Sequence, residues 1–444
     1  MSEITSKANV HSHLIFGNIR MKERGGQSLK KQITFMHAAD LHIDSPFKGL
    51  TRIPEIIKQD VLTSTFTAVD QLVRTAIAKE VDFVLLVGDI FDHALHSLKA
   101  QIHVRNACEK LEAHGIDVFM SFGNHDYLKG APFQLTYPAN VHIFQSEEVT
   151  HFPYVKDGEV CAHIYGFSYE NQAVTVKKAA QYEKTGDHVP FHIAMLHGSV
   201  DQNTDHEPYA PFKTADLIRK PFDYWALGHV HNRSILHQHP PIVYPGNTQG
   251  RHRRESGKKG CYYVEMNASE TKLEFIPLHS IEFKNIEIDM EHYETIEEVE
   301  DIINRFMDQY ADTQTPMLFH ITCKQVNESL MDLEKNGYMD ELIDVLNDGF
   351  ARLPIWKFIY KVGMELRHTS KERIQIEDHF LTELESTWDE ISIDSMLEPL
   401  FNHPQARTFL HKLSAKEKEE IIQDAREELI QALVLKRGDT DAFH

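Results

Sequence analysis

Cysteine is scarce in this 444-residue chain, and its four cysteines form no CxxC pair. This spacing argues against a disulfide framework and against a thiolate zinc site, and it fits a reducing compartment. No apolar run approaches the roughly 18–20 residues that a membrane-spanning helix needs, and the N-terminus lacks the layout of a secretory signal. We therefore expect a cytoplasmic protein with no membrane partner.

Positive charge is also in short supply. Lys and Arg number 46 against 67 Asp and Glu, which gives a formal net charge of −21. The excess acid is concentrated in residues 281–444, which hold 17 basic and 36 acidic residues. Residues 1–280 hold 29 basic and 31 acidic residues. A broad nucleic-acid-binding surface is therefore disfavoured, but the nearly neutral first part can still meet a polyanion locally.

Hydrophobic periodicity divides the chain into four parts. Residues 1–31 have no periodicity and are expected to form a flexible extension. Residues 32–280 alternate short apolar runs with helical stripes and then become rich in strands, which predicts an α/β layered domain. Residues 281–368 predict a small α+β domain, with a capping box at Thr295–Glu298, strands over 317–323 and 355–362, and one helix over 330–350. Residues 369–444 are predicted to be mainly helical.

Five short polar patterns follow predicted strands of the first domain, and this is where ligands gather in open α/β sheets. Each pattern alone is more often a turn or a hydrogen-bonded core residue, but five such coincidences in order are improbable. Imidazole, carboxylate and amide donors without thiolate suit first-row divalent ions such as manganese, iron or zinc. Two such ions about 3.5–4 Å apart would activate water and polarise a phosphoryl group. The patterns are Asp40-Leu41-His42, Gly88-Asp89, Gly123-Asn124-His125-Asp126, His197-Gly198 and His229-Val230-His231.

These five blocks resemble the calcineurin-like metallophosphoesterase superfamily. The resemblance implies a four-layer sandwich of two sheets flanked by helices, with two divalent metal ions, which we expect to be Mn²⁺. It also implies that Asp89 bridges the metals, that His125 is the general acid or phosphate stabiliser, and that Asp126 orients it. By the same resemblance one metal would be held by Asp40, His42, Asp89 and His231, and the other by Asp89, Asn124, His197 and His229.

A narrower resemblance is carried by residues 38–45, by Gly88–Asp92 and by Tyr244–Asn247. These segments are similar to the bacterial SbcD group of DNA repair nucleases and, within it, to YhaO-type exonucleases. That group implies that residues 281–368 form a capping domain, that the chain forms a homodimer, and that C-terminal helices bind an SbcC-like coiled-coil ATPase. Asp92 departs from the archaeal and eukaryotic relatives, which carry His there, so the role of that His does not transfer.

The densest basic cluster follows the last metal block. Its members are expected to contact DNA phosphates, with a solvated loop as the alternative. They are Arg251, Arg253, Arg254, Lys258 and Lys259.

The sequence thus predicts a metal-dependent DNA nuclease, most simply an exonuclease, that works with a partner ATPase. Two alternatives stay open. A metallophosphatase or cyclic-nucleotide phosphodiesterase would use the same metals, although the second domain disfavours a small substrate. A non-catalytic scaffold for the ATPase would have no need of His125. The helical stripe after Ser414, from Ile421 to Leu433, is the expected ATPase contact.

Overall fold

The computed structural model describes residues 32–47, 50, 53–92, 97–130, 135–200 and 209–366, with seven isolated helical positions between 393 and 425. The predicted extension over 1–31 and most of the predicted C-terminal helices lie outside the described residues. Two six-stranded sheets and a third, three-stranded sheet make up the described part. Within it, no helix combines the length and the apolar character needed to cross a bilayer.

The first sheet has the order β12-β11-β1-β2-β3-β4, with β1 to β4 parallel to one another. Its central strands are buried on both faces, because one face meets helices α1 (Glu55–Ala78) and α2 (Leu98–Glu112) and the other meets the second sheet. This burial on both faces explains the near-continuous apolar runs from which these strands are predicted. Its strands are β1 (Gln32–Ala38), β2 (Phe83–Val87), β3 (Asp117–Ser121), β4 (Val141–Ile143), β11 (Gly260–Asn267) and β12 (Thr271–Pro277).

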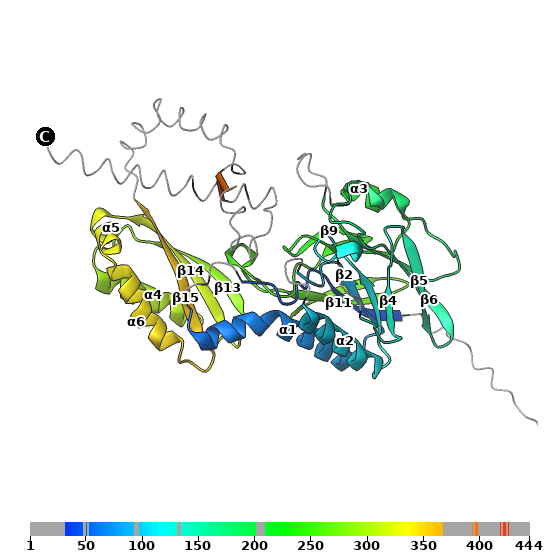
Figure 1. The fold of residues 1–444 in the computed structure, drawn as a ribbon, viewed down its shortest axis with the longest axis horizontal. Helices are drawn as coiled ribbons and strands as arrows, with labels where there is room; N and C mark the ends of the chain where they lie inside the picture. The colour runs from blue at the N-terminus through cyan, green and yellow to red at the C-terminus, as the bar shows by residue number, and fades with distance from the viewer. Residues whose placement is uncertain are drawn as a thin grey trace, which may run out of the picture.

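The second sheet packs against the first across a shared apolar core, and its order is β5-β6-β7-β8-β10-β9. Its far face is covered by α3 (Thr214–Ile218) and by loops. The predicted four-layer sandwich is therefore confirmed (Figure 1). The strands are β5 (Thr150–Lys156), β6 (Glu159–Gly166), β7 (Phe191–His197), β8 (Tyr224–Gly228), β9 (Ser234–Gln238) and β10 (Pro241–Tyr244).

The third sheet, β13-β14-β15, is entirely parallel. The capping box predicted at Thr295 and Glu298 is present at the start of α4. The single helix predicted over 330–350 is wrong, because the chain breaks into two helices at Gly337, whose φ of +81° is left-handed. The elements are β13 (Glu282–Asp289), α4 (Ile296–Asp308), β14 (Met317–Val326), α5 (Glu328–Lys335), α6 (Tyr338–Phe350) and β15 (Lys357–Leu366).

Helix α1 (Glu55–Ala78) joins the sandwich to the third sheet (Figure 1). Its first turns pack against the small domain rather than against the sandwich. Ile57 and Val61 lie in one apolar cluster with Trp356, whose indole Nε1 donates to Asp60 Oδ2 over 2.7 Å. Helix α2 (Leu98–Glu112) lies beside α1 on the outer face of the first sheet.

Candidate metal centre

All seven residues predicted to bind metal lie together at one edge of the sandwich. Their loops follow β1, β2 and β3 of the first sheet and β7 and β8 of the second, at the carboxyl ends of parallel strands. The backbone there is strained. Four of the seven residues have left-handed φ values between 43° and 96°, a conformation that costs non-glycine residues energy and is concentrated at functional sites. These four are Asp40, His42, Asp89 and His229.

The first group of donors consists of Asp40, His42 and His231, whose donor atoms all lie within 4.8 Å of one another. The Nε2 atoms of His42 and His231 are 3.1 Å apart, and His231 Nε2 is 3.9 Å from Asp40 Oδ1. His42 and Asp40 are buried, and His231 is partly exposed.

The second group consists of Asp89, His197 and His229, with donor atoms within the same 4.8 Å limit. Asn124 completes it, since its Oδ1 lies 3.1 Å from both His197 Nε2 and His229 Nδ1. Asp89 lies between the two groups. One of its oxygens, Oδ2, is 3.7 Å from His42 Nε2 and 3.4 Å from His197 Nε2, which is the position a bridging carboxylate requires.

Partners behind the site orient two of the imidazole rings. The Nδ1 of His197 is 3.1 Å from the carbonyl oxygen of Val87, and the Nδ1 of His231 is 2.6 Å from Glu255 Oε1. When each Nδ1 carries the proton, each Nε2 presents a lone pair to the centre, as in the carboxylate–histidine–metal arrangement of metalloproteins. Glu255 is a residue that the sequence reasoning missed. The available signal was a lone acid inside the basic segment that follows the last metal block.

The protonation states favour metal ligands. Burial lowers the pKa of His42 well below its usual value, and burial together with His197 lowers the pKa of His229 to about 3. Burial also opposes charge on His197, but the neighbouring Asp89 carboxylate outweighs it and raises the pKa to about 9. Neutral His42 and His229 can each offer a nitrogen lone pair to a cation. On His197, a bound metal ion would take the place of the proton that Asp89 stabilises there.

The donor set therefore fits two divalent ions. It supplies imidazole nitrogens, carboxylate oxygens and one amide oxygen, with no thiolate. Close packing holds the groups in place. A Cβ on Gly123 would lie 2.3 Å from Asp89 Oδ1 and 2.7 Å from His197 Nε2, so only glycine leaves room for both side chains.

His125, the expected general acid, lies beside the first group. Its ring packs edge-on against His42 with centroids 4.9 Å apart, and its backbone N–H donates to Asp89 Oδ1 over 3.0 Å. His125, His42 and Asp92 have donor atoms within 4.8 Å of one another, so Asp92 is the carboxylate beside this ring.

Asp126, expected to orient His125, contacts backbone amides in the structure, and its orienting role stays a prediction. Its Oδ2 accepts from the backbone N–H groups of Ile90, over 2.6 Å, and Phe91, over 3.3 Å, and its Oδ1 accepts from Gly123 over 2.6 Å. Asp126 therefore braces the loops that follow β2 and β3. Burial raises its pKa to about 7, and the nearby Asp89 charge adds to this shift.

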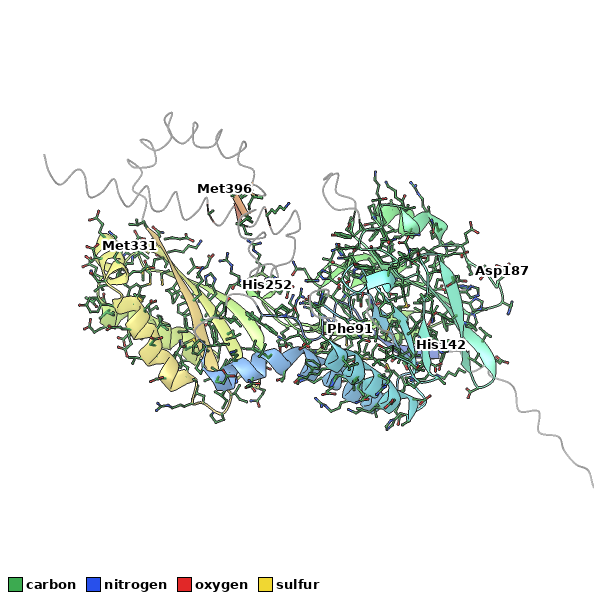
Figure 2. The ribbon with its side chains drawn as sticks, viewed as in Figure 1. Phe91, His142, Asp187, His252, Met331 and Met396 are labelled. Atoms are coloured by element: carbon green, nitrogen blue, oxygen red, sulfur yellow. The ribbon has the colours of Figure 1, made fainter. Side chains whose placement is uncertain are left out.

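The predicted basic cluster divides into two parts. Arg251 is largely buried and its guanidinium contacts Asp92 and Glu255, while Lys259 is buried and donates to the carbonyl oxygen of His231. These two side chains face the interior rather than a surface polyanion. Arg254 and Lys258 are exposed and Arg253 is half-buried. Figure 2 shows the neighbouring His252 between the sandwich and the small domain.

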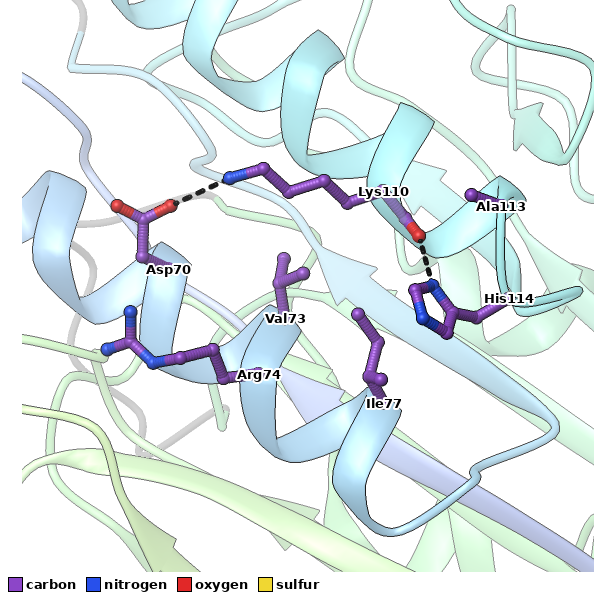
Figure 3. A pocket seen from close by; sticks show the side chains of 7 residues that line it. All are labelled: Asp70, Val73, Arg74, Ile77, Lys110, Ala113 and His114. Carbon is purple, nitrogen blue, oxygen red and sulfur yellow. Dashed lines mark hydrogen bonds and ion pairs between the residues drawn. The ribbon is translucent and has the colours of Figure 1, made fainter.

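A separate surface hollow of about 400 Å³ lies between α1 and α2 (Figure 3). Lys110 spans it to Asp70 over 3.7 Å, and His114 Nδ1 is 2.9 Å from the Lys110 carbonyl oxygen. It shares no residue with the donor groups, so it is not part of the metal centre. Its lining residues are Asp70, Val73, Arg74, Ile77, Lys110, Ala113 and His114.

A two-sheet sandwich with this donor set at its edge is typical of a metallophosphoesterase. The family model described as Calcineurin-like phosphoesterase matches residues 33–233. The chain is also 35% identical over 407 residues to the Bacillus subtilis (strain 168) protein named Uncharacterized metallophosphoesterase YhaO, covering 91% of this chain and 97% of that protein. The chain therefore belongs to the calcineurin-like metallophosphoesterase family.

More distant similarity reaches proteins named DNA double-strand break repair protein Mre11. The Thermoplasma acidophilum protein is 27% identical over 277 residues, covering 58% of this chain and 69% of that protein. The Sulfurisphaera tokodaii protein is 26% identical over 336 residues, covering 73% of this chain and 80% of that protein. The resemblance to an SbcD/Mre11-like group is thereby confirmed.

Proposed function

We propose that this protein is a metal-dependent DNA nuclease, acting as an exonuclease in DNA repair with an SbcC-like ATPase. The observation that carries the proposal is the convergence of seven donor side chains and His125 beside a small domain joined to the sandwich by α1. The Mre11 proteins, whose names assign them to double-strand break repair, support DNA as the substrate.

The two groups of donors would hold two divalent ions, with Mn²⁺ as the proposed metal, and Asp89 would bridge them. When bound, such ions polarise a phosphoryl group and lower the pKa of a water ligand. His125 lies at the rim of the first group, where it can give a proton to the departing oxygen of the scissile phosphodiester. Asp92 lies beside its ring and helps to hold that proton.

The test compares three substrates with one preparation. The full chain with Mn²⁺ is incubated with end-labelled linear DNA, with p-nitrophenyl phosphate and with cyclic nucleotides. We expect DNA degradation, and we expect Asp89→Asn and His125→Ala to abolish it. Asp89→Asn should also lose bound metal, whereas His125→Ala should keep it.

Matched controls are Asp187→Asn and His142→Ala, which change the same residue types away from the strand-end loops (Figure 2). Both controls should degrade DNA like the parent protein. Turnover of the small substrates without DNA degradation would favour the metallophosphatase or cyclic-nucleotide phosphodiesterase. Metal binding without any hydrolysis would favour the non-catalytic scaffold.

We propose that Arg253 and Arg254, in the basic segment that follows the last metal block, contact DNA phosphates. Replacing Arg253 and Arg254 together by Ala should raise the dissociation constant for DNA mainly at low salt, because each lost phosphate contact reduces the salt slope by about 0.9. An unchanged slope would contradict this contact.

Two assemblies are also proposed. The predicted helix after Ser414 would bind the ATPase, and truncation before Ser414 should abolish co-purification of the two proteins.

The homodimer would use α1 and α2, where Leu62, Leu98 and Ile102 are 41%, 49% and 36% exposed. Leu62→Glu with Leu98→Glu should then yield monomers in sedimentation. The cytoplasmic location stays a prediction.

A further inference from the structure

The guanidinium of Arg251 lies between two carboxylates behind the metal centre. Its Nη1 is 3.2 Å from Asp92 Oδ2, and its Nη2 is 3.2 Å from Glu255 Oε1. The Arg251 and Asp92 side chains are each 12% exposed and that of Glu255 is 4% exposed, so the group is largely removed from solvent. Further hydrogen bonds hold both carboxylates. Ser45 Oγ donates to Asp92 Oδ2 over 2.8 Å, and Asn247 Nδ2 donates to Glu255 Oε2 over 2.9 Å.

Each of these carboxylates also faces a histidine of the site. Glu255 Oε1 is 2.6 Å from His231 Nδ1, which leaves His231 Nε2 directed at the first group of donors. Asp92 lies on the other side, with its Oδ2 4.0 Å from His42 Nδ1 and within the 4.8 Å cluster that contains His125. Arg251 is thus the one side chain, among the described residues of this cluster, that contacts both Asp92 and Glu255.

We propose that Arg251 is a positioning residue that ties the metal ligand His231 to the proton donor His125 through Glu255 and Asp92. The proposal rests on the two-metal site of the proposed function and is independent of the substrate being DNA. It also assigns Arg251 a place inside the protein, instead of the phosphate contact expected from its neighbours in the sequence.

The physical reason is the fork geometry of arginine. The two terminal nitrogens of a guanidinium point in fixed, divergent directions and can hold two carboxylates at a set separation, whereas a lysine ammonium is a single point on a flexible stem. Without Arg251, two largely buried carboxylates would lose their shared cation and turn towards other donors or water. His231 would then lose its fixed ring orientation, and Asp92 its place beside His125.

The experiment measures Mn²⁺ binding to the full chain by calorimetry, together with hydrolysis of bis(p-nitrophenyl) phosphate. Arg251→Met should weaken Mn²⁺ binding by about 10–100-fold, the usual effect of removing the support of a metal ligand. Arg251→Lys should lose most of the same affinity. Both variants should lower kcat while KM changes less than twofold, because Arg251 does not touch the substrate.

A double-variant cycle tests the route through Glu255. Glu255→Gln should weaken Mn²⁺ binding like Arg251→Met, and the double variant should be no weaker than the poorer single one, because both act on His231. The control is Lys156→Met, which breaks a 2.7 Å ion pair to Asp82 elsewhere in the sandwich. It should lower thermal stability and leave Mn²⁺ affinity unchanged.

Several results would overturn the proposal. They are parental Mn²⁺ affinity in Arg251→Met or in Glu255→Gln, additive losses in the double variant, and an equal loss of affinity in Lys156→Met. A raised KM with a reduced salt slope for DNA and unchanged Mn²⁺ binding would instead make Arg251 a phosphate contact. If Arg251→Met does not fold, Arg251→Lys and Glu255→Gln decide the matter. Failure of the parent protein to bind Mn²⁺ would overturn the proposed function itself.

Discussion

Gly123→Ala is expected to disable the metal centre while leaving the fold intact. The added Cβ would lie 2.3 Å from Asp89 Oδ1, whereas carbon–oxygen contacts in proteins are seldom closer than about 3.3 Å. The carboxylate must therefore withdraw by about 1 Å. Asp89 would no longer lie midway between the two groups of donors, and His197, 2.7 Å from the new atom, would also be displaced.

A displacement of about 1 Å at a catalytic group can cost about 100-fold in rate, equivalent to about 2.7 kcal/mol. We expect a loss of this order in hydrolysis of bis(p-nitrophenyl) phosphate and a comparable weakening of the second Mn²⁺ equivalent in calorimetry. Circular dichroism should remain that of the parent, because the φ of Gly123 is not left-handed and Ala can adopt it. The reasoning would be refuted by a Gly123→Ala protein that binds two Mn²⁺ ions with parental affinity.

Four further predictions concern stability. Gly349→Ala should raise the free energy of unfolding by about 0.5–1 kcal/mol in urea titrations, since the new Cβ in α6 meets nothing within 4 Å, and it also serves as the metal-binding control for Gly123→Ala. Thr295→Ala should lower that free energy by about 1 kcal/mol by removing the cap of α4, and Thr295→Ser should restore most of it. Trp356→Ala should cost about 3–5 kcal/mol, because the indole is 7% exposed between α1 and the third sheet; a loss below 1 kcal/mol would show that this junction contributes little. Mn²⁺ at 100 times its dissociation constant should stabilise the protein by about 2.7 kcal/mol, and EDTA should reverse this; a melting temperature indifferent to EDTA would contradict the metal site.

The central strands could be predicted from the sequence, because burial on both faces leaves an unbroken apolar run. The run at Phe83–Val87 is such a strand, and all of its residues are buried. The edge strands β5 and β9 of the second sheet could not be predicted in this way. β5 contains Pro153 and four of its seven residues are exposed, and β9 has no fully buried residue, so neither carries an apolar run. The break at Gly337 was missed because apolar spacing continues across it.

The seven donors and His125 could be named from the sequence because their motifs resemble those of the metallophosphoesterase family. Strand position supported the assignment, since parallel strands of a sheet share one carboxyl end. The contacts of the charged residues that support this site could not be predicted from the sequence. Arg251 and Arg254 stand in one basic segment, yet only the packed fold turns the first inward to Asp92 and leaves the second exposed. Asp126 likewise follows His125 in the chain but contacts backbone amides instead.

The sequence motifs thus determined which side chains meet at the metal centre, since they match the ligand blocks of the family and each lies at the end of a predicted strand. Tertiary packing decided which charged groups support them. The partner of a buried charge is whichever opposite charge the folded chain brings within about 3 Å, and Asp92 and Arg251 are 159 residues apart.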